Sequence, residues 1–297
     1  MEKKLTSRII EDLLKKNPIS DKNKTISTKS YKLIENEILS YNTNKAVLGI
    51  DIYRYSQYPS VPQMLIPFLF KQLFNDSINN CIEHEPFIFK NITKKYFTEH
   101  FIDTGDGGFQ IFDNPFQAII FAIYFQSNIS RYNSIHNHTA NLFEIIDEIT
   151  LRYSLTFDNL YSFEKNFYGP SIINCARIMS KDKLNRFLID ENTKKWFSKE
   201  LNGVENLQFF EINRDLDEIS FLNNKENKEV EVDSVLFNSD SCKIKNVALM
   251  KIGEIKSKLD ILSIYNLNIQ TLMFSPSSKY KKHAITLGNL NSNGLIE

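Results

Sequence analysis

The order of apolar segments between residues 45 and 181 restricts the fold more than any other feature of this sequence. A buried strand pattern is followed by a helical pattern, a glycine-centred hairpin, a second helical pattern, another strand and a third helix. The six segments are residues 45–56, 61–82, 94–112, 114–132, 148–157 and 169–181. This order predicts an α+β domain built on a ferredoxin-like mixed sheet that is rich in antiparallel pairs.

Outside these segments the sequence predicts a helical start, one insertion and a tail. Residues 1–44 combine an amphipathic helix with a polar linker, and they precede a domain at residues 45–267. Within the domain, the composition turns polar at about residues 200–243, which predicts an inserted loop, and strand-like alternation returns at residues 247–270. We expect residues 268–297 to form an exposed tail.

Composition and charge exclude several classes of protein. With 42% hydrophobic and 12% aromatic residues, the 297-residue chain can bury a sizeable core. Lys plus Arg equal Asp plus Glu at 36 each, so no overall basic field favours nucleic acid as a partner. The amino-terminal helix carries interspersed charges, and nowhere do about 18 apolar residues run together, so we expect no membrane partner. Three widely spaced cysteines, Cys81, Cys175 and Cys242, lack zinc-site spacing and fit a cytoplasmic protein.

A Gly-Asp-Gly-Gly turn at residues 105–108 contains the first candidate functional residue, Asp106. Between two apolar runs this turn is typical of a β-hairpin, and a hairpin alone would explain its glycines. A functional role needs a second acid nearby, and Asp51 at the carboxyl end of the first strand supplies one. In the predicted fold that strand can lie beside the hairpin. Two carboxylates from neighbouring strand ends could hold Mg²⁺ or Mn²⁺, and two such ions could support phosphoryl transfer.

Five segments resemble, in the same order, motifs of the class III nucleotidyl cyclases. The first two are similar to the metal-binding motifs of the family, the third to a strand of Leu-Arg-Ile-Gly type, the fourth to an Ala-Ala-Arg helix, and the fifth to the closing hairpin. They are IDIYRYS (50–56), DTGDGGFQIF (103–112), LRYSLTF (151–157), YGPSIINCARI (168–178) and KIGEIKSKLDILSIYNL (251–267). The resemblance therefore covers residues 45–267 apart from the insertion.

The resemblance implies a class III cyclase domain that has helices packed on one face of its sheet and works as a homodimer. It places Asp51 and Asp106 on the two metal-binding aspartates, and the backbone carbonyl of Ile52 on the position that completes the shell of one ion. It places Arg177 on the arginine that stabilises charge at the pentacoordinate phosphorus. In the family these groups come from opposite subunits. The resemblance thus implies two Mn²⁺ or Mg²⁺ ions in each site and a site that a dimer completes.

Three positions depart from the family's pattern. Ile173 stands where the family has the asparagine that orients the ribose, and Asn174 lies one step along, about 100° around a helix. Purine cyclases recognise their base with a lysine and a polar residue, at the positions of Ile102 and Asn166. An isoleucine cannot donate to a purine, whereas an asparagine amide can donate to and accept from a pyrimidine edge. Asn174 is therefore a candidate catalytic residue, and the nucleotide-binding candidates are Ile102, Asn166 and Tyr55.

The chain lacks the residues with which purine cyclases recognise their base, and in this it resembles the pyrimidine cyclases of the bacterial Pycsar antiphage systems. The cyclic UMP or cyclic CMP that those enzymes make activates a separate effector protein. This resemblance implies a phosphorus–oxygen lyase that converts UTP, or next CTP, to the 3′,5′-cyclic monophosphate and pyrophosphate. Two alternatives stay open: a purine cyclase, and a degenerate cyclase domain that binds nucleotide or dimerises without catalysis. Retention of Asp51, Asp106 and Arg177 favours catalysis, because a binding module does not need the complete charge-stabilising set.

Overall fold

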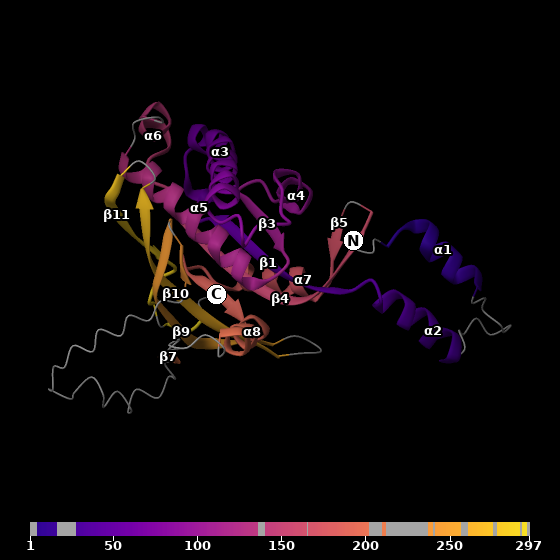
Figure 1. Cartoon of the computed structure of the whole chain (residues 1–297). Coiled ribbons are helices and arrows are strands. Elements are labelled where there is room, and N and C mark those ends of the chain that lie inside the picture. Colours follow the sequence, from indigo (N-terminus) through magenta and orange to yellow (C-terminus); the bar gives the residue numbers. More distant parts are fainter. Residues whose placement is uncertain are drawn as a thin grey trace, which may run out of the picture.

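The structure is a computed structural model that describes most of the chain (Figure 1). The described residues are 5–16, 28–135, 140–164, 166–201, 210–211, 237–239, 241–256, 261–275, 278–291 and 293–295. The helices are α1 Ser7–Lys16, α2 Thr28–Leu39, α3 Ser60–His84, α4 Lys94–Glu99, α5 Pro115–Ile135, α6 Ala140–Ile146, α7 Pro170–Lys181 and α8 Glu191–Leu201, with a 3-10 turn η1 at Tyr55–Gln57. The strands are β1 Thr43–Ile52, β2 Phe101–Asp103, β3 Gly107–Phe112, β4 Leu151–Phe163, β5 Asn166–Tyr168, β6 Phe187–Asp190, β7 Phe210–Glu211, β8 Phe237–Asn238, β9 Cys242–Lys256, β10 Ile261–Ser275 and β11 Ser278–Leu287.

The sheet is built around β1, which pairs antiparallel with β3 on one side and with β4 on the other. Its first four strands lie in the order β2-β3-β1-β4, which is the ferredoxin-like arrangement, and β6, β10, β9 and β7 extend it beyond β4. Among the strands described, β6 runs parallel to β4 and β7 runs parallel to β9, while the other pairs are antiparallel. The prediction of an α+β fold on an antiparallel-rich mixed sheet is confirmed.

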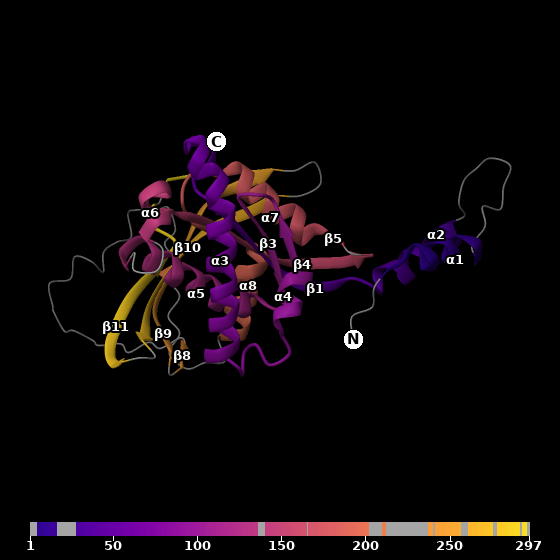
Figure 2. The same cartoon turned by 90° about the horizontal axis from the view of Figure 1, so that it is seen from above.

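Helices cover both faces of this sheet. On one face α3 and α5 lie side by side (Figures 1 and 2), where the rings of Phe74 and Phe121 have centroids 5.1 Å apart. On the opposite face α7 packs on β1 and β4, with Cys175 against Val47. The central part of β1 is buried on both sides, because its apolar residues run almost continuously rather than alternating. The prediction that helices pack on one face of the sheet is therefore correct for α3, α5 and α8. It is wrong for α7, which covers the opposite face.

The amino-terminal helices α1 and α2 extend away from the sheet and its covering helices (Figures 1 and 2). Residues 5–7 are held by the β4–β5 hairpin, because the Leu5 amide donates to the Ser162 carbonyl at 3.1 Å and the Ser7 hydroxyl donates to Glu164 at 2.7 Å. Part of the predicted linker is helical in α2, whose Tyr31, Ile34 and Ile38 have helical spacing. Residues 17–27 lie outside the described residues.

The prediction of an exposed tail after residue 267 is wrong. That boundary falls inside β10, and the following strand β11 pairs with β10 along its length. Ile285 and Leu287 of β11 are 5% and 0% exposed, so this strand contributes to the core. The reason is visible at residues 285–287, where the apolar Ile285 and Leu287 flank a threonine in a strand-like pattern that the preceding lysines obscure.

Two other predicted segments differ from the structure or lie mostly outside it. The first six residues of the expected hairpin at residues 94–112 form α4, because the Thr93 hydroxyl caps a helix by accepting from the Tyr96 amide at 3.2 Å. Most of the expected insertion at residues 200–243 is outside the described residues, although β7 and β8 within it pair with β9. None of the helices in the described ranges is long and apolar enough to cross a membrane.

Asp190 joins β6 to α8 and gives the first prediction. Its side chain is buried and accepts from the Thr193 amide at 2.8 Å, and burial raises its pKa to about 7. Protonation of Asp190 stabilises the folded state. This contribution to the free energy of unfolding has its full value below the ordinary pKa of 3.8 and is lost as the pH rises through about 7. Asp190→Asn keeps the acceptor and removes this titration. We expect the free energy of unfolding of this variant, minus that of wild type, to increase by about 2–4 kcal/mol from pH 4 to pH 8, as measured by chemical unfolding. A difference that does not change with pH would contradict this.

Candidate active site

Asp51 and Asp106 lie at one end of the sheet, where β1 ends and the β2–β3 turn meets it. Asp51 is opposite Gly107 in the β1–β3 register, and the Ile52 amide donates to the Asp106 carbonyl at 3.1 Å. A side chain at Gly107 would overlap the backbone oxygen of Ile50, so only glycine allows the two strands to approach so closely. The structure therefore brings together the two acids that the sequence placed on neighbouring strand ends.

The turn before Asp106 is closed by Asp103. The Asp103 carboxylate accepts from the Gly105 amide at 2.7 Å, in the manner of an Asx turn. Gly105 has a φ of 98°, a left-handed conformation that favours glycine. Asp103 is exposed, whereas Asp106 is half-buried. The two aspartates of this turn thus have different surroundings, and Asp106 is the one beside Asp51.

The carboxylate of Asp51 lies in a partly desolvated and crowded electrostatic environment. Its side chain is 15% exposed, and its pKa is raised from 3.8 to about 6, first of all because burial disfavours the charged form. Arg152 opposes this effect, and the neighbouring Asp106 carboxylate adds to it. A positive ion beside these two neighbouring carboxylates would stabilise the ionised form of Asp51.

Arg152 is the direct partner of Asp51, and sequence reasoning missed it. The two residues are opposite each other in the β1–β4 register, and Nε of Arg152 donates to the Asp51 carboxylate. A second nitrogen, Nη1, donates to the backbone carbonyl of Asp182 at 2.7 Å, so Arg152 is held at two points. The sequence did give one signal, because Arg152 is a charged residue in a strand pattern that otherwise predicts burial. Its partner could not be identified, because that depends on the β1–β4 register.

A pocket of about 380 Å³ opens beside the two acids. It is lined by both carboxylates and by three basic side chains, those of Arg54, Arg152 and Lys183. Arg54 and Lys183 are exposed, and Lys183, which follows α7, was not foreseen from the sequence. A pocket with this mixture of charges suits a ligand that carries several negative charges together with cations.

The loop after β1 forms another wall of this pocket. Ile52 and Tyr55, two of the predicted site residues, both line it. The hydroxyl of Tyr55 donates to the Gln63 carbonyl at 2.8 Å, which ties the η1 turn to the first part of α3. Arg54 has a φ of 60°, an uncommon value for a residue with a side chain, and it precedes η1. The loop is therefore fixed in shape where it borders the acids.

Arg177 and Asn174 project from α7 outside this pocket. They lie three residues apart on the helix, and Nη1 of Arg177 donates to the Asn174 amide oxygen at 3.3 Å. Arg177 is exposed and Asn174 is half-buried, and neither lines the pocket that contains Asp51 and Asp106. In a single chain the two predicted catalytic side chains therefore lie together, outside the pocket that both carboxylates line.

Ile102 and Asn166, the candidates for base recognition, also lie outside the pocket. Ile102 is half-buried on β2, opposite Phe109, and Asn166 is exposed at the start of β5, opposite Phe163. The structure of one chain does not bring these two residues to the acids.

Among the described residues that line this pocket, Asp51 and Asp106 are the two with carboxylate side chains. Within the described part of the chain, no group of three or more His, Cys, Asp or Glu side chains could hold a metal ion. Any ion bound by Asp51 and Asp106 would need further oxygens from the backbone, from water or from a substrate. This donor set, few carboxylates with open positions, is the one that Mg²⁺ and Mn²⁺ prefer in phosphate chemistry.

Comparisons with known proteins give similarities of structure at low identity. No family model and no curated protein matches the sequence. Among solved structures, the chain is similar to an adenylate/guanylate cyclase/hydrolase from Silicibacter pomeroyi, with 11% identity, a TM-score of 0.38, and coverage of 76% of this chain and 96% of that one. It is also similar to the guanylate cyclase domain of RhGC from Catenaria anguillulae in complex with GTP, with 13% identity, a TM-score of 0.42, and coverage of 75% and 95%. A third similarity is to the guanylyl cyclase Cya2, with 9% identity, a TM-score of 0.39, and coverage of 76% and 92%.

Proposed function

We propose that this chain is a nucleotidyl cyclase, which converts a nucleoside triphosphate to its 3′,5′-cyclic monophosphate and pyrophosphate. The observation that carries the proposal is the pair of carboxylates, Asp51 and Asp106, at a pocket that Arg54, Arg152 and Lys183 also line. Two acids can hold divalent cations, and the exposed Arg54 and Lys183 can attract a triphosphate, so the pocket has the charges that phosphoryl transfer requires.

The residues present fit two Mn²⁺ or Mg²⁺ ions. Asp51 and Asp106 would hold both ions, and the backbone carbonyl of Ile52, which borders the same pocket, would complete the shell of one. The raised pKa of Asp51 supports this fit, because burial disfavours its charged form and the Asp106 carboxylate adds to that effect, so bound cations would stabilise the ionised carboxylate. When bound, the ions would acidify the ribose 3′-hydroxyl and neutralise charge on the phosphates.

The side chains of this chain then position the substrate for an internal displacement. The 3′-oxygen forms a bond to the α-phosphorus, and the bond from that phosphorus to the bridging oxygen breaks. Pyrophosphate leaves with the bonding electrons, and the hydroxyl proton passes to solvent. Arg54 and Lys183, at the exposed rim, would attract the β- and γ-phosphates. Arg152 opposes the effect of burial on the Asp51 pKa and so favours the ionised carboxylate.

A homodimer would supply the remaining groups. Arg177 and Asn174 do not line the pocket of their own chain, and both are accessible on α7. In a two-fold dimer, Arg177 of the partner subunit would stabilise the charge that develops at phosphorus, and Asn174 of the partner subunit would orient the ribose. A cyclase domain that had lost catalysis would not need Arg177, which is why we favour an enzyme over a binding or dimerisation module.

For the base, we propose a pyrimidine, with UTP ahead of CTP, recognised by Asn166 beside the apolar Ile102. As in the pyrimidine cyclases that the motifs resemble, the product would act as a second messenger on a separate effector protein in antiphage defence. The deciding experiment incubates the purified chain with Mn²⁺ and each of the four triphosphates in turn, and identifies the products by mass spectrometry. Cyclic products from any triphosphate support a cyclase, and their absence in all four reactions, with nucleotide still bound, favours the binding module.

The choice of base gives the second prediction. UTP should be cyclised at least roughly tenfold faster than ATP or GTP, because a polar base edge buried without partners costs about 1–3 kcal/mol per group. Asn166→Ala should reduce this preference, with Asn159→Ala, in the partly exposed part of β4, as a matched control. Rates for ATP or GTP equal to the rate for UTP would exclude the pyrimidine proposal, and an unchanged preference in Asn166→Ala would exclude Asn166 as the residue that recognises the base.

A further inference from the structure

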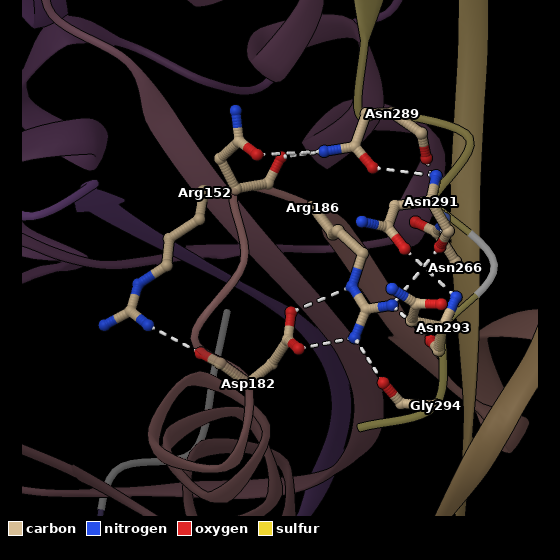
Figure 3. Close-up of polar contacts among 9 residues, drawn as sticks. Arg152, Asp182, Arg186, Asn266, Asn289, Asn291, Asn293 and Gly294 are labelled. Atoms are coloured by element: carbon tan, nitrogen blue, oxygen red, sulfur yellow. Dashed lines mark hydrogen bonds and ion pairs between the residues drawn. The ribbon is translucent and has the colours of Figure 1, made fainter. Parts of the chain in front are cut away.

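A continuous series of polar contacts connects Asp51 to the last described residues of the chain. Arg152 binds the Asp51 carboxylate through Nε and the backbone carbonyl of Asp182 through Nη1, at 2.7 Å. The side chain of Asp182 is in turn held by Arg186, whose Nε donates to one carboxylate oxygen at 3.0 Å and whose Nη2 donates to the other. Figure 3 shows Asp182 between the two arginines, with its carbonyl toward Arg152 and its carboxylate toward Arg186.

Arg186 is a buried cation whose hydrogen bonds are all used. It is 1% exposed, and a guanidinium has five N–H donors. Two bind Asp182, and the other three bind backbone carbonyls near the end of the chain: Asn291 at 3.2 Å, Asn293 at 2.6 Å and Gly294 at 3.3 Å. A buried charge is stable only when it is paired and its hydrogen bonds are made, so these carbonyls are part of the condition for keeping Arg186 in place.

Those carbonyls belong to residues 289–291 and 293–295, which we call the C-terminal segment. Asparagine side chains hold its shape: Asn289 Oδ1 accepts from the Asn291 amide, and Asn291 Oδ1 accepts from the Asn293 amide, both at 3.0 Å. Other amides fix the segment to the sheet, because Asn266 donates to the Asn289 carbonyl and Asn289 donates to the Asn185 carbonyl, both at 2.7 Å (Figure 3). The segment thus turns its carbonyls toward Arg186 by an ordered set of bonds.

An apolar contact holds the end of the C-terminal segment. Leu295 packs against a cluster that contains Ile178 of α7 and Leu188 of β6, on the face of the sheet that α7 covers. Its side chain lies 3.5 Å from the position that a Cβ would take at Gly253. The segment therefore contacts both the sheet and the helix that ends just before Asp182.

We propose that the C-terminal segment is a positioning element of the candidate metal site, acting on Asp51 through Arg186, Asp182 and Arg152. The inference rests on the proposed function, since it assumes that Asp51 holds a metal ion. Without the segment, three donors of the buried Arg186 lose their acceptors, and Arg186 must move or recruit water. A shift of Arg186 moves Asp182, whose carbonyl is one of the two groups that hold Arg152. Arg152 then no longer fixes the Asp51 carboxylate.

The test measures Mn²⁺ binding by electron paramagnetic resonance, together with the unfolding midpoint of each protein. The network variants are Asn289→Ala/Asn291→Ala, which releases the segment, and the milder Arg186→Lys, which cannot make all five bonds. Removal of groups that orient a metal ligand typically costs 10- to 100-fold in affinity, so we expect Mn²⁺ affinity to fall roughly tenfold in both variants.

Two controls separate positioning from a general loss of stability. Leu290→Ala changes a side chain of the same segment that is 60% exposed, and it should bind Mn²⁺ as wild type does. Ile129→Val creates a small cavity in α5, in a different hydrophobic cluster from the one that Leu295 packs against, and it should lower the unfolding midpoint without weakening Mn²⁺ binding.

Each outcome decides a separate claim. If wild-type Mn²⁺ binding is not lost in Asp106→Asn, the proposed metal site itself fails. If the wild-type chain binds at that site but the network variants bind equally well, the positioning role is overturned while the metal site stands. If Ile129→Val weakens Mn²⁺ binding as much as the network variants do, the segment is merely structural, and the inference is again overturned. If the double variant does not fold, Arg186→Lys decides.

Discussion

Asp106→Asn is expected to reduce the rate of cyclisation by at least roughly 10³-fold while the protein stays folded. The amide has nearly the same size as the carboxylate, but it is a weak ligand for Mn²⁺ and carries no charge. Loss of the electrostatic stabilisation that two bound ions give should raise the barrier by several kcal/mol. The measurement is the initial rate with UTP and Mn²⁺, together with the unfolding midpoint of the variant.

The same turn offers a matched control. Asp103→Asn changes the other aspartate in the same way, and its side-chain oxygen can still accept from the Gly105 amide. Asp103 is exposed, so its replacement should leave the rate within about twofold of wild type. Equal losses of cyclisation rate in the two variants would mean that both charges are needed to maintain the shape of the turn. That result would contradict the assignment of Asp106 as a metal ligand.

Asp51 is a less suitable position for this test. Its carboxylate is the ion-pair partner of Arg152, a side chain that is only 26% exposed. Replacement of Asp51 by alanine would leave that guanidinium without its acid, which is destabilising in a partly buried place. A loss of activity in such a variant would therefore combine the loss of a metal ligand with a change in the fold.

Mixing an Asp106→Ala protein with an Arg177→Ala protein is expected to restore about a quarter of wild-type activity, although neither parent is active. If each site takes its carboxylates from one subunit and Arg177 from the other, each mixed dimer contains one complete site. Random exchange makes half of the dimers mixed. The single chain supports this arrangement, because Arg177 does not line the pocket of Asp51 and Asp106.

The control for this experiment is a mixture of Asp106→Ala with Asp106→Asn. Both changes lie in the same half of the site, so no combination of these chains can make a complete one. Exchange of subunits must be checked by native mass spectrometry of differently tagged chains. A mixture of Asp106→Ala and Arg177→Ala that exchanges freely and stays inactive would show that each chain contains a whole site.

Local periodicity was sufficient to predict the part of the fold that positions the two acids. The strand at residues 45–56 and the glycines of the hairpin are local signals, and the β2-β3-β1-β4 order follows from the sequence of elements. The placement of α7 on the second face was not predictable in this way, since it depends on how Val47 and Cys175 fit together across the sheet. Likewise α4 depends on a single cap at Thr93.

The parts of the site that escaped prediction depend on pairings between distant residues. Arg152 meets Asp51 only because the β1–β4 register sets them opposite each other, and a shift by one residue would turn Arg152 to the other face. The C-terminal segment has a polar, asparagine-rich sequence that suggests exposure. Its role depends on backbone carbonyls, which every residue has and which no residue type reveals.

The close contact of β1 and β3 affects how related sequences should be judged. Gly107 is required by the backbone of Ile50, and a side chain at Gly108 would overlap the ring of Phe101. Packing alone therefore requires both glycines. A homologue that had lost catalytic activity would retain them as long as it retained the fold. Asp106 experiences no such steric demand. In a survey of homologues, loss of Asp106 with retention of the glycines would identify inactive members, whereas the glycines by themselves would identify only a shared architecture.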